Sequence, residues 1–419
     1  MPSADTDDPI VITGVGVVSP LGRTCEATWL GVLSGRSAAR RLTAADFLLP
    51  RRDPRWDATA WLGCPADLPV DSAWDRVTAL GLRAAAEASA DAGLDRTDLD
   101  PNQIGCVFGT SKGSLFAATA DWCGLGEVSS FPALWPSATA HAIAARFGWT
   151  GPCLAPVAAC ATGLVAVIRA AALIREGACD VVLAGSADDS LHPLVLASFQ
   201  RLGVLARHAE PTQASRPFDR DRNGFVIGVG AGGLVLERKS HAVARGARWY
   251  AAVGPGRFSA DPSGMTALDD SGATLARLIA DSVPADRVPD VINLHGTGTR
   301  LNDPAECRAV RLAIPQAARD SRAGSFKGAL GHLLGAAGSV ELALLCLAIR
   351  DQTLPPNVNR DCADPDCDLN WIGATPEPAT IKSVLKLSLG FGGHQAAVWL
   401  ERCRGVGERT VGRNKGSEV

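Results

Sequence analysis

The sequence has no excess of charge of either sign. Its 41 basic and 44 acidic residues give the 419-residue chain a formal net charge of −3, which supplies no basic field for nucleic acid or an anionic membrane. The first residues, MPSADTDDPI, lack the basic and apolar regions of a signal peptide. The most apolar long run, 333–349, is short for a bilayer span and contains Glu341. We therefore expect a cytoplasmic protein that binds neither membrane nor nucleic acid.

Cysteine pairs with metal-ligand spacing are also missing. The chain has 12 cysteines but no CxxC pair. Cys362 and Cys367 lie close together, yet no histidine or further cysteine stands nearby to complete a zinc site. In the absence of an export signal, we expect reduced thiols and no metal site.

What the sequence does contain is a repeated alternation of apolar strands and helices. Hydrophobic residues make up 47% of the chain. The pattern predicts strands over 8–22, 104–111, 179–189 and 230–239, with a helix over 72–94. It begins again after residue 243, with helices over 271–282 and 332–350 and strands over 289–296, 381–393 and 395–402. Continuous apolar strands indicate an α/β protein whose sheets are covered on both faces. The two series suggest a duplicated architecture, although no residue-level repeat is visible.

Cys160 lies in an unusual place, between a short apolar run and a run with helical spacing. Small residues follow it in ACATG. A free buried cysteine most often acts as a small hydrophobic residue. A thiol on a strand-to-helix turn can instead be a nucleophile, because the amides at the helix N-terminus lower its pKa. This stretch alone leaves both interpretations open.

Further turns carry residues that are suited to catalysis. His295 opens the loop HGTGT, and His332 is predicted to start a buried helix, where the dipole favours a neutral imidazole. Glu341 in the same helix is costly to bury unless it is paired, and Lys327 is its natural partner. Phe391 lies between glycines in a loop that can offer backbone amides. Each of these signals is weak alone, since a single histidine of this kind is more often a core residue.

In this order, ACATG, HGTGT..ND, K...GHLLGAAG.VE and GFGG resemble the motifs of β-ketoacyl-acyl carrier protein synthases, the condensing enzymes of fatty-acid and type II polyketide synthesis. The resemblance covers about residues 9–402. It implies a thiolase fold, with two αβαβα halves stacked as five layers and usually dimeric. The N-terminal half would span 1–242 and the C-terminal half 243–405, followed by a mobile polar tail over 406–419.

The resemblance also implies a decarboxylative Claisen condensation. Cys160 would take an acyl group from a carrier-protein thioester, and the amides of Cys160 and Phe391 would form the oxyanion hole, with Phe391 as a gate. His295 and His332 would hold the malonyl thioester and stabilise its enolate. The substrate's own carboxylate leaves as carbon dioxide, so no metal or organic cofactor is implied.

Other roles follow from the same motifs. Lys327 and Glu341 would set the charge and orientation of the two histidines. Thr297 and Thr299 would bind the phosphopantetheine arm of the acyl carrier protein. Lys112, at the end of a strand, would either cap the acyl tunnel or pair with an acid.

Several residues depart from the family pattern, which favours a specialised pathway over housekeeping fatty-acid synthesis. They are Asn223, Val229, Arg300, Leu389 and His394. A thiolase would need a second cysteine in the final loop, and a chain-length factor would lack the nucleophile; neither fits. A homodimer, a heterodimer with a ketosynthase-like partner, and a related acyltransferase without elongation all stay open.

Overall fold

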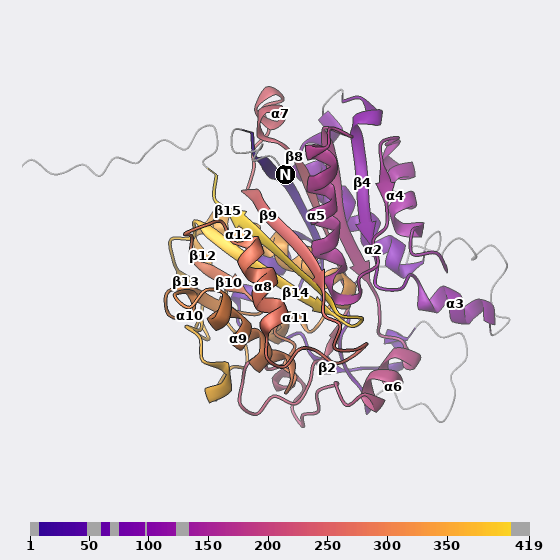
Figure 1. Ribbon diagram of the computed structural model, residues 1–419. Coiled ribbons are helices and arrows are strands. Elements are labelled where there is room, and N and C mark those ends of the chain that lie inside the picture. The colour runs from indigo at the N-terminus through magenta and orange to yellow at the C-terminus, as the bar shows by residue number, and fades with distance from the viewer. Residues whose placement is uncertain (1–7, 48–59, 68–74, 97–98, 123–133, 404–419) are drawn as a thin grey trace, which may run out of the picture.

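A computed structural model describes residues 8–47, 60–67, 75–96, 99–122 and 134–403 (Figure 1). The predicted mobile tail lies outside these residues. Ten strands in the described part of the chain form one mixed sheet. The predicted strands form because their Val, Ile and Ala side chains are buried; every residue of β1 (Ile10–Val18) and β6 (Val181–Asp188) is buried.

The large sheet consists of two runs of five strands with the same order. In the first half the order is β5 (Cys153–Leu154), β4 (Ile104–Gly109), β6, β8 (Gly230–Arg238) and β1. In the second half it is β11 (Arg322–Gly324), β10 (Val291–Asn293), β14 (Ser383–Gly390), β15 (His394–Glu401) and β9 (Ala251–Ala260). In each half the first three strands are parallel and the last two pairings are antiparallel. The predicted duplication is therefore confirmed.

The two halves join where β1 pairs with β9 over Ile10–Ile12. The first half occupies the indigo-to-magenta side of Figure 1 and the second half the orange-to-yellow side. The predicted division after residue 242 falls within α7 (Lys239–Ala244), and it stays a prediction.

Helices form three further layers around and between the half-sheets. On the outer face of the first half lie α2 (Arg76–Asp91) and α4 (Ala138–Phe147). Between the halves lie α5 (Thr162–Arg175) and α12 (Ala337–Asp351), and against the second half lies α8 (Ala273–Ser282) with α9 (Asn302–Ala313) packed on it. The predicted five layers are thus present.

Short elements complete the described chain. The remaining helices are α1 (Cys25–Leu33), α3 (Leu115–Trp122), α6 (Pro193–Arg201), α10 (Ala317–Asp320) and α11 (Lys327–Leu330). The small sheets combine β2 (Arg40–Arg41), β3 (Leu62–Cys64) and β7 (Ile227–Gly228), and β12 (Thr353–Leu354) with β13 (Glu377–Pro378). No helix among the described residues is both long and apolar enough to cross a membrane.

The two central helices touch through glycine. A Cβ atom on Gly163 of α5 would lie 2.4 Å from the backbone nitrogen of Ser339 in α12. The hydroxyls of Ser339 and Ser186 on β6 are 2.7 Å apart. This close approach brings together the two segments that precede α5 and α12. The first segment contains Cys160 and the second contains His332.

One expectation about the second turn is wrong. The predicted helix over 332–350 begins only at Ala337. His332 lies in an extended segment instead, where its N–H donates to the Val226 carbonyl at 2.7 Å and its carbonyl accepts from Gly228 at 2.8 Å. These bonds to a neighbouring segment replace helical ones, so a helix dipole does not act on His332.

We predict that Gly163→Ala destabilises the fold by about 1–3 kcal/mol, because the added methyl group must push α5 away from α12 backbone. Chemical unfolding of both proteins measures the difference. Arg169→Ala, on the exposed face of the same helix, should change stability by less than about 0.5 kcal/mol beyond its surface ion pair. Equal stability of Gly163→Ala and the parent protein would contradict the close helix contact.

Candidate active site

The turn that carries Cys160 is held in a strained shape. Cys160 lies in a short 3₁₀ turn, Ala159–Ala161, that leads into α5. Ala159 has φ +46°, a left-handed conformation that costs a non-glycine residue energy. The Thr162 hydroxyl stabilises the turn, since it accepts from Ala158 N at 2.9 Å and donates to the Ala159 carbonyl at 2.8 Å. The predicted turn before a helix is therefore present.

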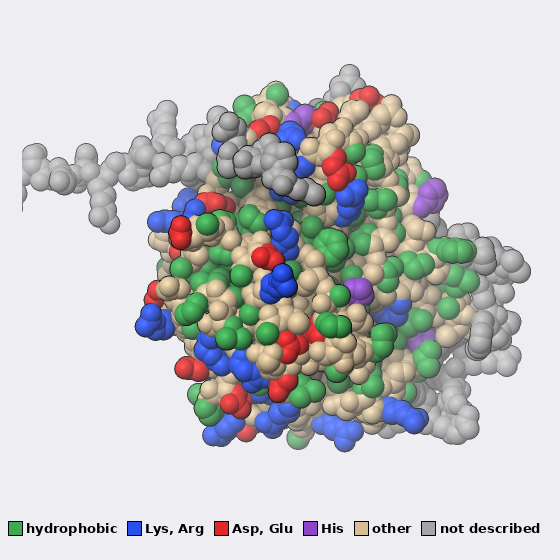
Figure 2. All heavy atoms as spheres, viewed as in Figure 1, with side chains coloured by type: hydrophobic (Ala, Val, Ile, Leu, Met, Phe, Trp, Pro, Cys, Tyr) green, Lys and Arg blue, Asp and Glu red, His purple; other side chains and the backbone are tan. Residues whose placement is uncertain are grey.

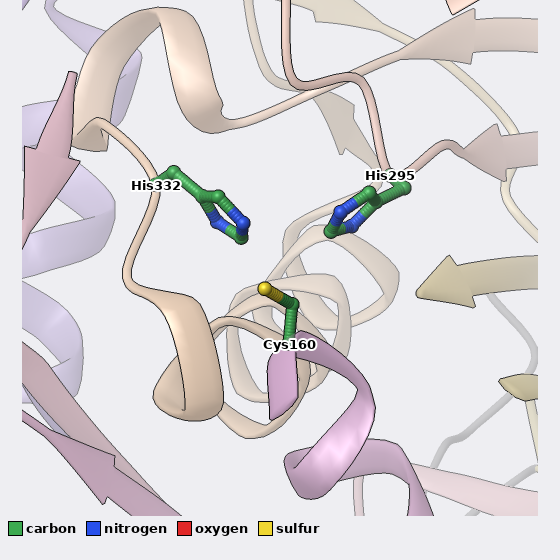
Figure 3. A group of neighbouring side chains, drawn as sticks. All are labelled: Cys160, His295 and His332. Atoms are coloured by element: carbon green, nitrogen blue, oxygen red, sulfur yellow. The ribbon is translucent and has the colours of Figure 1, made fainter. Parts of the chain in front are cut away.

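Both histidines are held beside this thiol by their backbones. His295 follows β10, and its N–H donates to a carboxylate oxygen of Glu306 in α9 at 2.6 Å, while Gly296 N donates to the other oxygen at 2.7 Å. The rings of His295 and His332 lie 5.1 Å apart at 80°. The sulfur of Cys160 points between them (Figure 3), and one ring nitrogen of each lies within 4.8 Å of the sulfur and of the other.

Burial makes all three groups neutral at pH 7. It raises the pKa of Cys160 to about 12, with a smaller contribution from the Asp188 carboxylate and opposing ones from Lys112 and Lys327. The pKa of this thiol is therefore raised rather than lowered, because desolvation is the largest contribution to it. Burial, followed by the charge of Lys327, holds the pKa of His332 well below its usual value, and that of His295 likewise.

Both imidazoles are thus neutral; the sequence indicated this for His332, but the cause is burial and nearby positive charge rather than a helix dipole. The Nδ1 atoms of both rings are buried without a hydrogen-bond partner among the described residues. This favours the tautomer in which Nε2 carries the proton and Nδ1 is a bare acceptor, because a buried N–H without a partner costs more than a lone pair. Each ring therefore has one N–H to offer to a substrate.

A cluster of buried charges lies behind the histidines. The predicted pair of Lys327 and Glu341 is present at 2.7 Å between Nζ and Oε1. Lys386, on β14, forms a second ion pair with Oε2 of Glu341. All three side chains are at most 1% exposed.

A cavity of about 260 Å³ opens onto the thiol and the two imidazoles. Its lining includes Cys160, His295, His332, Thr297, Thr299 and Phe391. The hydroxyls of Thr297 and Thr299 are 3.1 Å apart. The backbone N–H of Phe391 forms a hydrogen bond to the Cys160 thiol that lowers its pKa in part. The structure therefore brings all the predicted substrate-facing residues to one cavity.

The loop of Phe391 reaches the nucleophile because Gly390 has no side chain. A Cβ atom at Gly390 would lie 2.8 Å from the Ala158 carbonyl oxygen and 2.9 Å from Cys160 N. Phe391 itself is half-buried in the turn between β14 and β15, where its ring meets Phe199 edge to face at 5.9 Å.

The departures from the family pattern fall in two places. Asn223, Arg300, Leu389 and His394 line the cavity, whereas Val229 is fully buried in the core next to β8. Lys112 is absent from the cavity lining and pairs with Asp188 at 3.2 Å. Lys112 thus pairs with an acid of the same chain, and its role as a tunnel cap stays a prediction.

Two clusters in the described chain have the donor types of a metal site. One is Cys160 with the two histidines, which are soft ligands suited to zinc. The other is Asp219, Asp221 and Cys362. In the second, the Asp219 carboxylate already accepts from three backbone N–H groups, those of Asp221, Asp361 and Cys362, which is the pattern of a loop-stabilising residue.

Comparison with known proteins decides between the possible chemistries. Residues 7–242 match the model of the β-ketoacyl synthase N-terminal domain, and residues 250–361 match that of its C-terminal domain. The chain belongs to the β-ketoacyl synthase family. It is thus one of the acyltransferase-type condensing enzymes, with the thiolase-like fold described above.

Its relatives include polyketide enzymes. Over 413 aligned residues the synthase is 36% identical to the putative polyketide β-ketoacyl synthase 1 of Streptomyces halstedii, covering 93% of this chain and 97% of that protein. A solved type II polyketide acyl-carrier protein in complex with its ketosynthase matches with TM-score 0.86 and 28% identity, over 95% of this chain and 100% of that chain. The ishigamide ketosynthase/chain length factor matches with TM-score 0.82 and 29% identity, over the same shares.

Sequence reasoning missed two buried charges of this synthase. Lys386 lies in the otherwise apolar strand VLKLSL, a signal of the same kind as Glu341 in its helix. Glu306 follows the quoted HGTGT..ND motif by three residues and supports the histidine loop. Burial raises the pKa of Glu306 to about 7.

We predict that alkylation of Cys160 by iodoacetamide accelerates about tenfold per pH unit from pH 7 to pH 10, because its pKa of about 12 leaves the thiolate scarce. Cys153 is an internal control. It is exposed, and a hydrogen bond from Cys106 lowers its pKa to about 7, so its rate should level off above pH 8. Peptide mass spectrometry reads both sites in one sample. A Cys160 rate that levels off near pH 7 would show that the histidines ionise the thiol in the resting enzyme.

Proposed function

We propose that this synthase joins an acyl group held on Cys160 to a malonyl unit on an acyl carrier protein, releasing carbon dioxide and a 3-oxoacyl-carrier protein. The observation that carries the proposal is the thiol directed between two neutral imidazoles at one wall of the cavity. A thiol supplies the covalent acyl site, and two N–H donors supply a site for a developing enolate.

In the first step, the Cys160 sulfur attacks the carbonyl carbon of an acyl thioester. The backbone N–H groups of Cys160 and Phe391 stabilise the oxyanion. The C–S bond of the incoming thioester breaks, and the thiol proton leaves with the pantetheine sulfur. Since the thiol is neutral at rest, it loses this proton as its sulfur bonds to the carbonyl carbon.

In the second step, the Nε2–H groups of His295 and His332 donate to the carbonyl oxygen of the malonyl thioester. The C–C bond to the carboxylate breaks and carbon dioxide leaves. The electron pair of that bond stays on the remaining carbon and forms the enolate. The enolate carbon attacks the acyl carbon on Cys160, the C–S bond breaks, and the released thiolate takes a proton from solvent. Thr297 and Thr299 hold the pantetheine arm, and Lys327 with Glu341 orients His332.

We further propose that no metal or organic cofactor takes part, because loss of carbon dioxide itself generates the carbanion. An acyl carrier protein is the partner that supplies both substrates, and the enzyme works in the cytoplasm. The relatives named for polyketide synthesis, together with the departures at the cavity, favour a specialised pathway over fatty-acid synthesis.

A heterodimer is the second candidate assembly. The specific observation in its favour is the match to the ishigamide ketosynthase/chain length factor. In that case this chain, with its thiol and both histidines, is the catalytic subunit. Size-exclusion chromatography with light scattering of the chain alone distinguishes a stable homodimer from a subunit that needs its partner. A related acyltransferase without elongation would load Cys160 but release no carbon dioxide.

We predict that Cys160→Ala abolishes both acylation and condensation, because it removes the nucleophile. Replacement of His295 or His332 by Ala should leave an acyl adduct on Cys160 but lower carbon dioxide release from a malonyl thioester at least about 100-fold. Intact-protein mass spectrometry reads the adduct. Loss of loading with normal decarboxylation in the histidine variants would reverse the assignment.

Arg300 tests the carrier interaction. It is exposed at the cavity, where it donates to the Arg220 carbonyl at 3.0 Å. We predict that Arg300→Glu raises the apparent KM for a malonyl-loaded type II acyl carrier protein, more so at low salt, because the carrier and its phosphate are anionic. Arg319→Glu, an exposed change on α10, is the matched control. An unchanged KM at every salt concentration would leave Arg300 an ordinary surface residue.

A further inference from the structure

We propose that Lys386 is a positioning residue of the decarboxylation step: it binds the second oxygen of Glu341 and leaves a net positive charge behind the two histidines. The inference deepens the proposed function and rests on it. Lys386 does not line the cavity, so it acts through Glu341 and the backbone rather than on the substrate.

The geometry of Lys386 links three parts of the site. Its ammonium pairs with Oε2 of Glu341, the oxygen that Lys327 leaves free. It also donates to the carbonyls of Leu387 at 2.6 Å and Leu294 at 3.5 Å. Leu294 immediately precedes His295. The same ammonium therefore connects β14, which leads to the Phe391 loop, with α12 and with the histidine strand.

Stability alone does not account for a lysine at this place. Lys386 is fully buried in a strand of apolar residues. Burial of an ion carries a desolvation cost, and an apolar side chain of similar volume is often neutral or stabilising in such a position. Glu341 already has Lys327 as a partner, so the second ammonium is not required to neutralise it.

The ion cluster behind the histidines has one positive charge in excess. Two ammoniums, on α11 and β14, face one carboxylate on α12. Glu306 on α9 points to the histidine loop, where three N–H donors hold its carboxylate. Cys160 is neutral at rest, and more distant Lys112 is paired with Asp188. The group Lys327–Glu341–Lys386 thus carries a charge of +1 while both lysines are protonated.

A positive charge at this place has two effects on the reaction. It stabilises the negative charge that develops on the enolate oxygen held by the histidines, more strongly in a dry interior than in water. It also keeps the imidazoles neutral, since the charges of Lys327 and Lys386 both lower the pKa of His295. Burial lowers the pKa of Lys386 itself to about 8, with Glu341 opposing the shift.

The test compares the full-length enzyme with Lys386→Met, which removes the charge and the hydrogen bonds, and Lys386→Gln, which can keep hydrogen bonds without the charge. Carbon dioxide release from malonyl-N-acetylcysteamine measures decarboxylation, and mass spectrometry measures loading of Cys160 from an acyl-N-acetylcysteamine. Both variants should lose about tenfold or more in decarboxylation at pH 7 and keep loading within about threefold.

The pH profile separates this role from a structural one. In the parent enzyme decarboxylation should fall above about pH 8, as Lys386 loses its proton. Both variants should lack this fall, and their acid limb should move to higher pH, because removal of a positive charge makes the histidines easier to protonate. Lys382→Met, an exposed change on the same segment of chain, should keep the parent profile.

Each outcome is decisive. Parent-like rates and pH profile in both variants would overturn the role of Lys386, and full activity of Lys386→Gln alone would show that hydrogen bonds rather than charge matter. Thermal unfolding of each variant shows whether it is folded, and loading of Cys160 confirms an intact nucleophile. If the parent enzyme itself releases no carbon dioxide, the proposed function fails and the inference about Lys386 falls with it, whereas a parent enzyme that decarboxylates at the same rate as both variants overturns the inference alone.

Discussion

The arrangement of the site depends on one buried carboxylate. Glu341 lies in the first turns of α12 and meets ammonium groups from α11 and β14. Separation of these charges in a dry interior would leave unpaired ions, which costs several kcal/mol. The three elements are therefore fixed relative to one another. His332 lies two residues after the end of α11, and the Phe391 loop follows β14, so the same ion cluster sets the places of an imidazole and of the Phe391 loop.

Neutral reactive groups surround this charged cluster. The thiol of Cys160 has a raised pKa and the two imidazoles have lowered ones, in each case chiefly because they are buried. In the resting site the charged side chains of Lys327, Glu341 and Lys386 therefore lie behind the residues that line the cavity. Negative charge develops on a carbonyl oxygen in the cavity when a thioester is attacked or a carboxylate leaves as carbon dioxide, and the fixed dipoles and ammoniums are already in place to stabilise it.

The sequence was most informative where local chemistry decides structure. The turns of Cys160, His295 and Phe391 were predictable, because glycine and small residues at strand ends have few other uses. The start of α12 was not, since the backbone of His332 bonds to a segment about 100 residues away. Strand β9 was also missed. It contains Pro255 and two glycines, which argue against a strand, yet it pairs with β1 and, through an irregular register, with β15.

The pKa of Cys160 and the place of Lys386 were beyond the sequence for a common reason. Both follow from how much water the folded chain excludes, and this is a property of five layers together rather than of any motif. A lysine in an apolar strand can be read as an edge residue that reaches solvent. Only the packing of α12 across β14 shows that it is enclosed and faces Glu341.

The duplicated fold finally explains why one half carries the nucleophile. In each half a short 3₁₀ turn precedes the central helix, Ala159–Ala161 before α5 and Leu334–Ala336 before α12. The two turns begin with the same strained conformation, φ +46° at Ala159 and φ +45° at Leu334. Aligned on them, ACATG matches LGAAG, so a weak residue-level repeat exists after all, and Gly335 takes the place of Cys160.

The space around Gly335 excludes any side chain at this position. Its N–H donates to the Asp188 carboxylate at 3.2 Å, and a Cβ atom there would lie 2.7 Å from Ser111 N. Around Cys160 the corresponding space is the cavity. The repeat thus supplies two equivalent turns at the centre of the molecule. The first half closes the turn before α12 with Asp188 and Ser111, and the second half contributes its histidines to the turn of Cys160, so a symmetric frame yields a single reaction site.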